Sequence, residues 1–142
     1  MAATAEQIMR LRRMVAEADS TTYDNTTIAE YIERYPLLDE LGEEPYTWDM
    51  STTPPHQDVN TWWVPTYDLN AAAADVWDEK AATVAQDYDY SADGASFSRS
   101  RVVEQYERRA RSYRARRSAH TIKQVAWPDE GNALDNRPAW LA

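Results

Sequence analysis

Two histidines and several groups of carboxylates are the residues in this chain whose types could support catalysis or metal binding. His56 lies in a proline-rich segment and His120 at the end of an expected helix, and neither has a second ligand at the spacing of a known metal-binding motif. A solvated side chain is therefore the favoured interpretation of both histidines.

The carboxylates offer no stronger pattern for chemistry. Asp75, Asp78 and Glu79 could bind a cation, but acidic residues at this helical spacing usually form a solvated face. Three aspartates in 87–93 partly resemble a calcium-binding loop. A loop that begins at Asp87 or Asp89 lacks the glutamate required at its twelfth position, so we reject this motif. Glycine-rich phosphate loops and nucleophile motifs are missing as well. We therefore expect a protein that is not an enzyme and has no catalytic, cofactor-binding or metal-binding residues.

Size and composition fit a soluble domain. The chain has 142 residues, of which 43% are hydrophobic, and this is enough for one core. It has no cysteine, which excludes disulfides and thiolate metal sites. Neither a membrane-length apolar run nor the hydrophobic block of a signal peptide occurs. The expected protein is cytoplasmic when made and makes no membrane contact.

Apolar periodicity predicts the helices that must position any site. They are expected over about residues 5–19, 27–35, 69–88 and 98–120. Thr4 with Gln7, and Thr27 with Glu30, have the spacing of a capping box, while Asp68 is a suitable N-cap for the third helix. The sequence therefore predicts a mainly α protein built on four helices.

The segments around these helices contain the prolines and most of the tryptophans. Pro36 should end the second helix, and 37–41 is expected to form one further helical turn closed by Gly42. Residues 43–67 are rich in proline and tryptophan and predict a long ordered loop or a short β-hairpin. We expect a helical domain over 1–123 and an extended tail over 124–142.

Formal charge is strongly segregated along the chain. Residues 1–95 contain 19 acidic and 5 basic side chains, 96–123 contain 2 and 9, and 124–142 contain 3 and 1. The net charge of −9 therefore combines one basic helix with an otherwise acidic chain. A distribution of this kind favours contact with other charged surfaces.

The basic helix has a narrow apolar stripe and an arginine-rich remainder. The stripe consists of Val103, Tyr106, Ala110 and Tyr113. Four arginines are expected to point away from it: Arg101, Arg108, Arg111 and Arg116. Glu104 and Glu107 each precede one of these arginines by four residues, but such pairs leave most of the arginines unpaired. Three uses remain open for these arginines: pairing within the domain, nucleic-acid binding, and contact between subunits.

Several short motifs between residues 67 and 118 carry a resemblance to a known family. They lie at 67–82, which reads YDLNAAAADVWDEKAA, and at 87–91, 92–94, 98–100, 104–106 and 113–117. This stretch resembles the head–tail adaptor (connector) proteins of tailed bacteriophages. The first two expected helices match only by pattern, the tail hardly matches, and the tryptophan-rich segment 43–67 departs from the family.

The resemblance implies an α-helical subunit of a dodecameric ring beneath the capsid portal, without catalysis or a cofactor. Such a ring links the portal to the stopper or tail and forms part of the channel through which DNA leaves. The implied partners are the portal protein, a stopper or other tail-proximal neck protein, and further copies of the chain. Genomic DNA would pass through without specific binding, and the implied location is the capsid–tail junction of the virion.

Charge, composition and resemblance together suggest three sets of contact residues. Arg101, Arg108, Arg111 and Arg116 are expected to contact a neighbouring subunit or the portal. Trp127, Trp140 and Leu141 are expected to anchor the tail on the portal. Trp48, Trp62 and Trp63 are expected to face the next neck protein. The alternatives are a nucleic-acid-related protein, either a DNA binder through the basic helix or an acidic DNA mimic, and a different neck component such as the stopper, which should be richer in strands.

Overall fold

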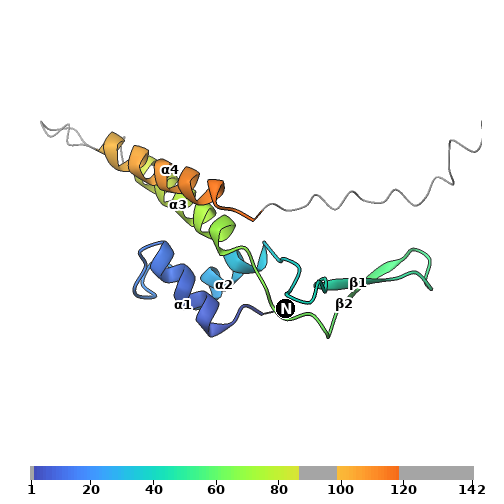
Figure 1. Ribbon diagram of the computed structural model, residues 1–142. Coiled ribbons are helices and arrows are strands. Elements are labelled where there is room, and N and C mark those ends of the chain that lie inside the picture. The colour runs from blue at the N-terminus through green and yellow to red at the C-terminus, as the bar shows by residue number, and fades with distance from the viewer. Residues whose placement is uncertain (1, 87–98, 119–142) are drawn as a thin grey trace, which may run out of the picture.

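Four helices and one small antiparallel sheet make up the described part of the chain (Figure 1). The computed structural model describes residues 2–86 and 99–118. The elements are α1 (Ala5–Met14), α2 (Asn25–Glu33), β1 (Tyr46–Asp49), β2 (His56–Val59), α3 (Leu69–Gln86) and α4 (Arg99–Ala115). The expected mainly α fold, with a short hairpin between the second and third helices, is confirmed. The expected tail over 124–142 lies outside the described residues.

Helix α3 lies at the centre of the fold. Figure 1 shows α4 antiparallel to α3 along one side, with α1 and α2 along the other. The side chains of the alanine run from Ala71 to Ala74 are at most 3% exposed, because neighbours cover this part of the helix on all sides. Small side chains let those neighbours approach closely. The Trp77 ring packs on the Tyr106 ring of α4 at 5.1 Å between centroids.

The core extends from α3 into the first two helices. Its largest fully buried side chains are Leu11, Val15, Ile28, Ile32 and Val76. All except Val76 lie within the helices expected over 5–19 and 27–35, in pairs four residues apart, as one helix face requires.

Helix α1 begins as expected but ends earlier. The Thr4 hydroxyl accepts from the Gln7 N–H while the Gln7 side chain accepts from the Thr4 N–H, which confirms the capping box. The helix ends at Met14 rather than near Asp19, and Ala16 adopts a φ of 57°. The end is closed locally: the Glu17 N–H donates to the Arg12 carbonyl at 2.9 Å and the Ala16 N–H to the Arg13 carbonyl at 3.4 Å, which is the Schellman pattern.

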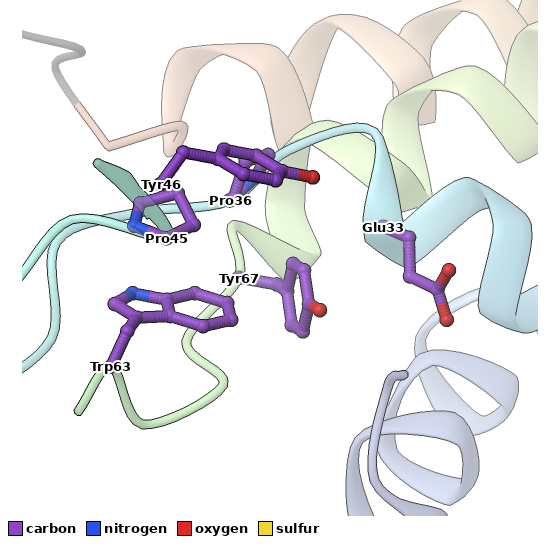
Figure 2. A pocket seen from close by; sticks show the side chains of 6 residues that line it. All are labelled: Glu33, Pro36, Pro45, Tyr46, Trp63 and Tyr67. Atoms are coloured by element: carbon purple, nitrogen blue, oxygen red, sulfur yellow. The ribbon is translucent and has the colours of Figure 1, made fainter. Parts of the chain in front are cut away.

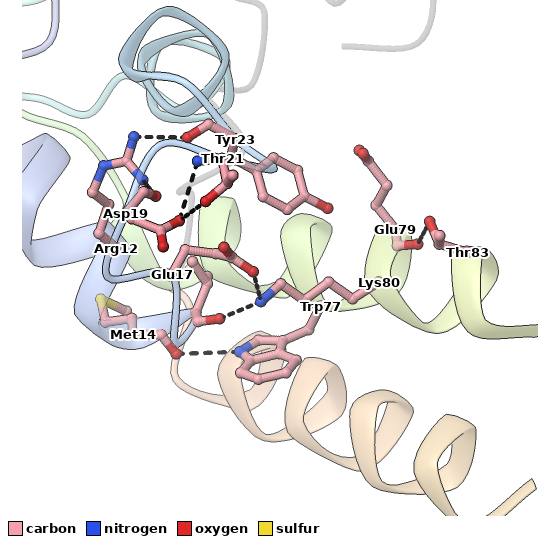
Figure 3. Close-up of polar contacts among 11 residues, drawn as sticks. Arg12, Met14, Glu17, Asp19, Thr21, Tyr23, Trp77, Glu79, Lys80 and Thr83 are labelled. Atoms are coloured by element: carbon pink, nitrogen blue, oxygen red, sulfur yellow. Dashed lines mark hydrogen bonds and ion pairs between the residues drawn. The ribbon is translucent and has the colours of Figure 1, made fainter. Parts of the chain in front are cut away.

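Side chains of α3 and α4 bind the carbonyls at the end of α1. Trp77 Nε1 donates to the Met14 carbonyl at 3.2 Å (Figure 3). The Tyr113 hydroxyl donates to the same oxygen at 3.1 Å. Lys80 Nζ donates to the Val15 carbonyl at 2.7 Å and forms an ion pair with Glu17. These donors satisfy carbonyls that a helix end leaves without partners, and the ammonium complements the negative end of the helix dipole.

Helix α2 begins earlier than its sequence predicts. Asp24 is the N-cap and its carboxylate accepts from the Thr27 N–H at 2.7 Å, so Thr27 lies inside the helix and the predicted cap there is wrong. The helix ends at Glu33, three residues before Pro36, as expected.

The segment 37–41 is not helical, which corrects the expectation of a further turn of helix. The buried Asp39 carboxylate accepts from the N–H groups of Leu41 (2.8 Å), Glu43 (2.9 Å) and, across the chain, Val64 (3.0 Å). Gly42 has a φ of +82°, a conformation that glycine adopts without strain. A side-chain-centred turn therefore replaces the helical hydrogen bonds.

Asp68 joins three parts of the chain. Its Oδ1 accepts from the N–H groups of Asn70 and Ala71 and so caps α3 as expected. Its Oδ2 accepts from the Ser118 N–H at 2.8 Å, and its own N–H donates to the Tyr35 carbonyl at 2.9 Å. One carboxylate thus fixes the start of α3 against the end of α4.

Candidate interaction surfaces

Seven arginines of α4 and of the two residues after it divide into an outward and an inward set. The side chains of Arg101, Arg108, Arg111 and Arg116 are exposed, in agreement with their predicted position off the apolar stripe. Arg111 lies 3.7 Å from Glu107. Arg101, Arg108 and Arg116 form no ion pair with a carboxylate among the described residues. We call these four side chains the outward arginine set.

The inward set holds α4 to the rest of the domain. Arg114 forms an ion pair with Asp78 and lies 4.0 Å from Asp75. Arg109 lies over the Trp77 ring at 4.8 Å from its centroid, and Arg117 over the Tyr35 ring at 5.7 Å. Pairing within the domain therefore accounts for one part of the basic charge and leaves the outward set available.

The β1–β2 hairpin projects from the helical body (Figure 1). Its strand register gives it two chemically different faces. The register pairs Tyr46 with Val59 and Trp48 with Gln57, so these four side chains share one face. On that face Trp48 is 62% exposed and Val59 56% exposed. An antiparallel hairpin with an uncovered apolar face is typical of a surface that binds another molecule.

The two neighbouring tryptophans beyond β2 differ in their surroundings. Trp62 is 81% exposed, whereas Trp63 is 4% exposed and its Nε1 donates to the Leu37 carbonyl at 2.8 Å. The expectation that Trp63 faces a partner is therefore corrected: it is a core residue whose ring packs edge-on against Tyr67 at 5.4 Å. Trp48 and Trp62 remain candidates for that contact.

A small cleft lies where the hairpin joins the body (Figure 2). Its volume is about 90 Å³, and Figure 2 shows its lining of Glu33, Pro36, Pro45, Tyr46, Trp63 and Tyr67. Burial, together with the negative charge of Glu33, raises the pKa of Tyr67 to about 12. The phenol is therefore neutral at pH 7 and can donate a hydrogen bond, while the aromatic walls fix the base of the hairpin.

Backbone hydrogen bonds also hold the hairpin at a defined angle to the body. The Leu37 N–H donates to the Thr66 carbonyl at 2.8 Å, next to a bridge between Pro36 and Tyr67. The N–H groups around Asp39, led by that of Val64, hold the pKa of its carboxyl below the usual value. The hairpin is thus anchored at its base while its strands stay exposed.

The second face of the hairpin is polar and contains a group that sequence spacing did not reveal. His56 Nε2 lies 3.1 Å from Asp58 Oδ1, and His56 Nδ1 lies 3.9 Å from Asp49 Oδ2. Hydrogen bonds from the Ser51 hydroxyl and N–H lower the pKa of Asp49. The absence of a metal-motif spacing around His56 still holds; the two carboxylates reach it through strand pairing, which sequence spacing does not show.

The remaining predicted site residues cannot be placed. Trp127, Trp140 and Leu141 lie outside the described residues, as do His120 and the segment 87–93. Comparison of the chain with protein-family models, curated proteins and solved structures finds no match. Within residues 2–86 and 99–118, no helix is both long enough and apolar enough to cross a bilayer.

Proposed function

We propose that this chain is a structural head–tail adaptor subunit of a phage neck. In this proposal several copies form a ring under the portal, link the capsid to the stopper or tail, and enclose part of the DNA channel. The sequence resemblance over residues 67–118 suggested the role. The observation that carries the proposal is the outward arginine set, on a helix that α3 separates from the acidic part of the domain.

Charge complementarity supports contact between copies of the chain. Residues 24–58 contain nine acidic side chains and one basic side chain, while 99–117 contain eight basic and two acidic. Asp24, Glu30, Glu33, Glu40 and Glu43 are all exposed. The basic α4 and this acidic segment lie on different sides of α3, so a contact between them joins different surfaces of two copies. A heterologous contact of this kind closes into a ring when the rotation allows it.

The alternative of nucleic-acid binding is less well supported by the surroundings of the tyrosines in α4. Base stacking needs accessible aromatic rings beside the basic groups. Tyr106 packs against Trp77, and the Tyr113 hydroxyl donates to Met14, so both rings face the domain rather than the outward arginine set. Filter binding to duplex DNA at low salt separates the two functions, because salt-sensitive binding by the isolated chain would favour the alternative.

Charge reversal at the outward arginine set tests the subunit contact. The double variant Arg108→Glu/Arg116→Glu should abolish assembly on the cognate portal in electron micrographs, while the helical circular dichroism of the monomer stays unchanged. The matched control is Arg10→Glu/Arg13→Glu, which makes the same change in net charge at exposed positions of α1. Added salt should also weaken assembly of the wild type, because exposed charges are screened. Unimpaired rings from the Arg108/Arg116 variant would refute the proposal.

The adjacent tryptophans provide a test of the hairpin surface. Trp62→Ala should weaken co-purification with the cognate tail-side neck protein without lowering thermal stability, because its ring is 81% exposed. Trp63→Ala should instead lower stability by about 3–5 kcal/mol, since it removes a buried aromatic side chain. If Trp62→Ala and Trp48→Ala both bind like the wild type, the hairpin does not contact that partner.

The tail is assigned a separate role in the proposal. Trp127, Trp140 and Leu141 would dock on the portal as anchors of an extended segment. A chain truncated after Val125 keeps every element of the helical body and should lose portal binding. Portal binding equal to that of the full chain would remove the anchor role and leave the ring contact unaffected.

A further inference from the structure

The polar face of the hairpin gathers one imidazole and two carboxylates from β1 and β2. The register pairs Asp49 with His56 directly, and Asp58 lies two residues further along the same face. One ligand atom from each of the three side chains lies within 4.8 Å of the other two. We propose that Asp49, His56 and Asp58 bind a divalent transition-metal ion, with Zn²⁺ as the representative. This inference does not depend on the proposed role in a phage neck.

Hydrogen bonding around Thr52 favours Nε2 of His56 as the ring nitrogen that binds a metal. The Thr52 hydroxyl lies 3.1 Å from the Pro54 carbonyl and 3.5 Å from the Asp49 carbonyl, and both of these oxygens can only accept. When the single hydroxyl proton points to the Pro54 carbonyl, Thr52 Oγ1 accepts from His56 Nδ1, which lies 3.0 Å away. A neutral imidazole in this arrangement carries its lone pair on Nε2.

That lone pair faces a carboxylate. His56 Nε2 and Asp58 Oδ1 are 3.1 Å apart, and two acceptors at this distance repel each other unless a cation lies between or beside them. Either a proton or a metal ion meets this need. The contact of Nδ1 with Thr52 is also the arrangement found at metal sites, where the second ring nitrogen donates to a fixed oxygen and so orients the ring.

The carboxylate of Asp49 is oriented in a similar way. Its Oδ1 accepts from the Ser51 N–H at 2.8 Å and from the Ser51 hydroxyl at 2.6 Å. Its Oδ2 is directed toward the His56 ring. Ser51 thus acts as the outer support of one ligand and Thr52 as that of another, and both belong to the turn that connects the two strands.

Metal binding requires a modest closure of this group. Ligands around a tetrahedral Zn²⁺ with bonds of about 2.0–2.2 Å lie roughly 3.3 Å from one another. The side chains of His56 and Asp58 are 53% and 56% exposed, so they can rotate toward the ion without disturbing the core. Mixed imidazole and carboxylate donors favour Zn²⁺ and related ions, whereas Mg²⁺ and Ca²⁺ prefer ligand sets made of oxygen alone.

A bound ion would join the two strand ends on either side of the 50–55 turn. Because the ion would bind the paired hairpin and not the unfolded chain, it would stabilise the strand pairing on which the apolar face depends. Metal binding at Asp49, His56 and Asp58 would therefore stabilise the folded conformation of the exposed hairpin.

Calorimetric titration of tag-free full-length protein with ZnCl₂ tests the site. We expect saturable binding of one equivalent, and a loss of affinity of at least about tenfold in His56→Ala. Asp49→Asn, which keeps an acceptor for Ser51, and Asp58→Asn should each weaken binding as well. The matched control is His120→Ala, which changes the only other histidine of the chain and should bind like the wild type.

Nuclear magnetic resonance of the same variants locates the ion. Addition of ZnCl₂ should shift the amide signals of residues 47–59 in the wild type and not in His56→Ala. Three results would overturn the proposal: no saturable binding, equal affinity of wild type and His56→Ala, or equal binding of MgCl₂. The first would leave a protonated histidine as the cation of the trio, and the third would mean that the carboxylates alone attract ions.

Discussion

The Arg12→Ala substitution removes a buried guanidinium that closes the α1–α2 connection. Arg12 is only 9% exposed, although it follows the fully buried Leu11 on a short surface helix. Its Nη2 donates to the Tyr23 carbonyl at 2.7 Å and its Nη1 to the Asp19 carbonyl (Figure 3). Its Nη2 and Nε also donate to Asn25 Oδ1, at 2.8 Å and 3.1 Å. Alanine leaves all three acceptors without this donor.

The expected loss follows from which acceptors remain buried. A hydrogen bond to a charged group contributes about 1.5–3 kcal/mol, but the effects of bonds that share one group are not additive. Asp19 and Asn25 are exposed and can bind water in the variant, whereas Tyr23 is 4% exposed. We therefore expect a loss of about 2–4 kcal/mol in the free energy of unfolding, which corresponds to a fall in melting temperature of roughly 10 °C for a domain of this size.

Urea unfolding monitored by circular dichroism at 222 nm measures this loss. The matched control is Arg13→Ala, which removes the same side chain from the next, exposed position and should change stability by less than about 0.5 kcal/mol. Arg12→Lys keeps the charge but not the planar set of donors. Its loss in the free energy of unfolding should therefore lie between those of Arg13→Ala and Arg12→Ala. Equal unfolding midpoints for Arg12→Ala and Arg13→Ala would refute the reasoning.

Three further outcomes are expected from the same urea assay. Asp68→Ala should lower stability by about 1–3 kcal/mol, because α3 loses its cap and the Ser118 N–H its acceptor, while Asp68→Asn should lose less. Trp77→Ala should cost about 3–5 kcal/mol, since it leaves a cavity beside Tyr106; a change below about 1 kcal/mol would contradict the packing. The pKa of Asp39 is lower in the folded than in the unfolded state, so its stabilising effect is present above the unfolded value of 3.8 and is lost as pH falls through the lower folded value. Asp39→Asn should therefore flatten the decline in unfolding midpoint between about pH 5 and pH 2, and an unchanged decline would show that other groups cause it.

Local sequence signals predicted the start of helices better than their ends. The capping box of Thr4 and the cap at Asp68 use contacts within three residues, and both were predicted correctly. At the end of α1, by contrast, the Met14 carbonyl accepts from donors 63 and 99 residues away, which no local signal predicts. Asp24 was missed because two plausible capping signals lie three residues apart, and the backbone selects only one of them.

The candidate surfaces were predictable to different degrees, because some depend on local periodicity and others on contacts between distant residues. A helix repeats every 3.6 residues, so the apolar stripe of α4 is enough to place Arg101 and Arg108 on the opposite side. The Asp49–His56 pair depends on strand register, which the sequence leaves open in a short exposed hairpin. Trp62 and Trp63 are identical neighbours, and the contacts that bury Trp63, with the Leu37 carbonyl and the Tyr67 ring, are tertiary ones that the local sequence does not show.

The outward arginine set and the apolar face of the hairpin lie on different elements that are joined to one rigid core. Helix α3 is covered on all sides along its alanine run, so α4 cannot shift relative to α1 and α2 without opening the core. The hairpin is tied to the same body through the buried Asp39 and Trp63. Its exposed apolar face and the outward arginine set are therefore held at fixed positions by different elements. A partner bound at one surface leaves the other accessible, which is the geometry that a link between two larger assemblies requires.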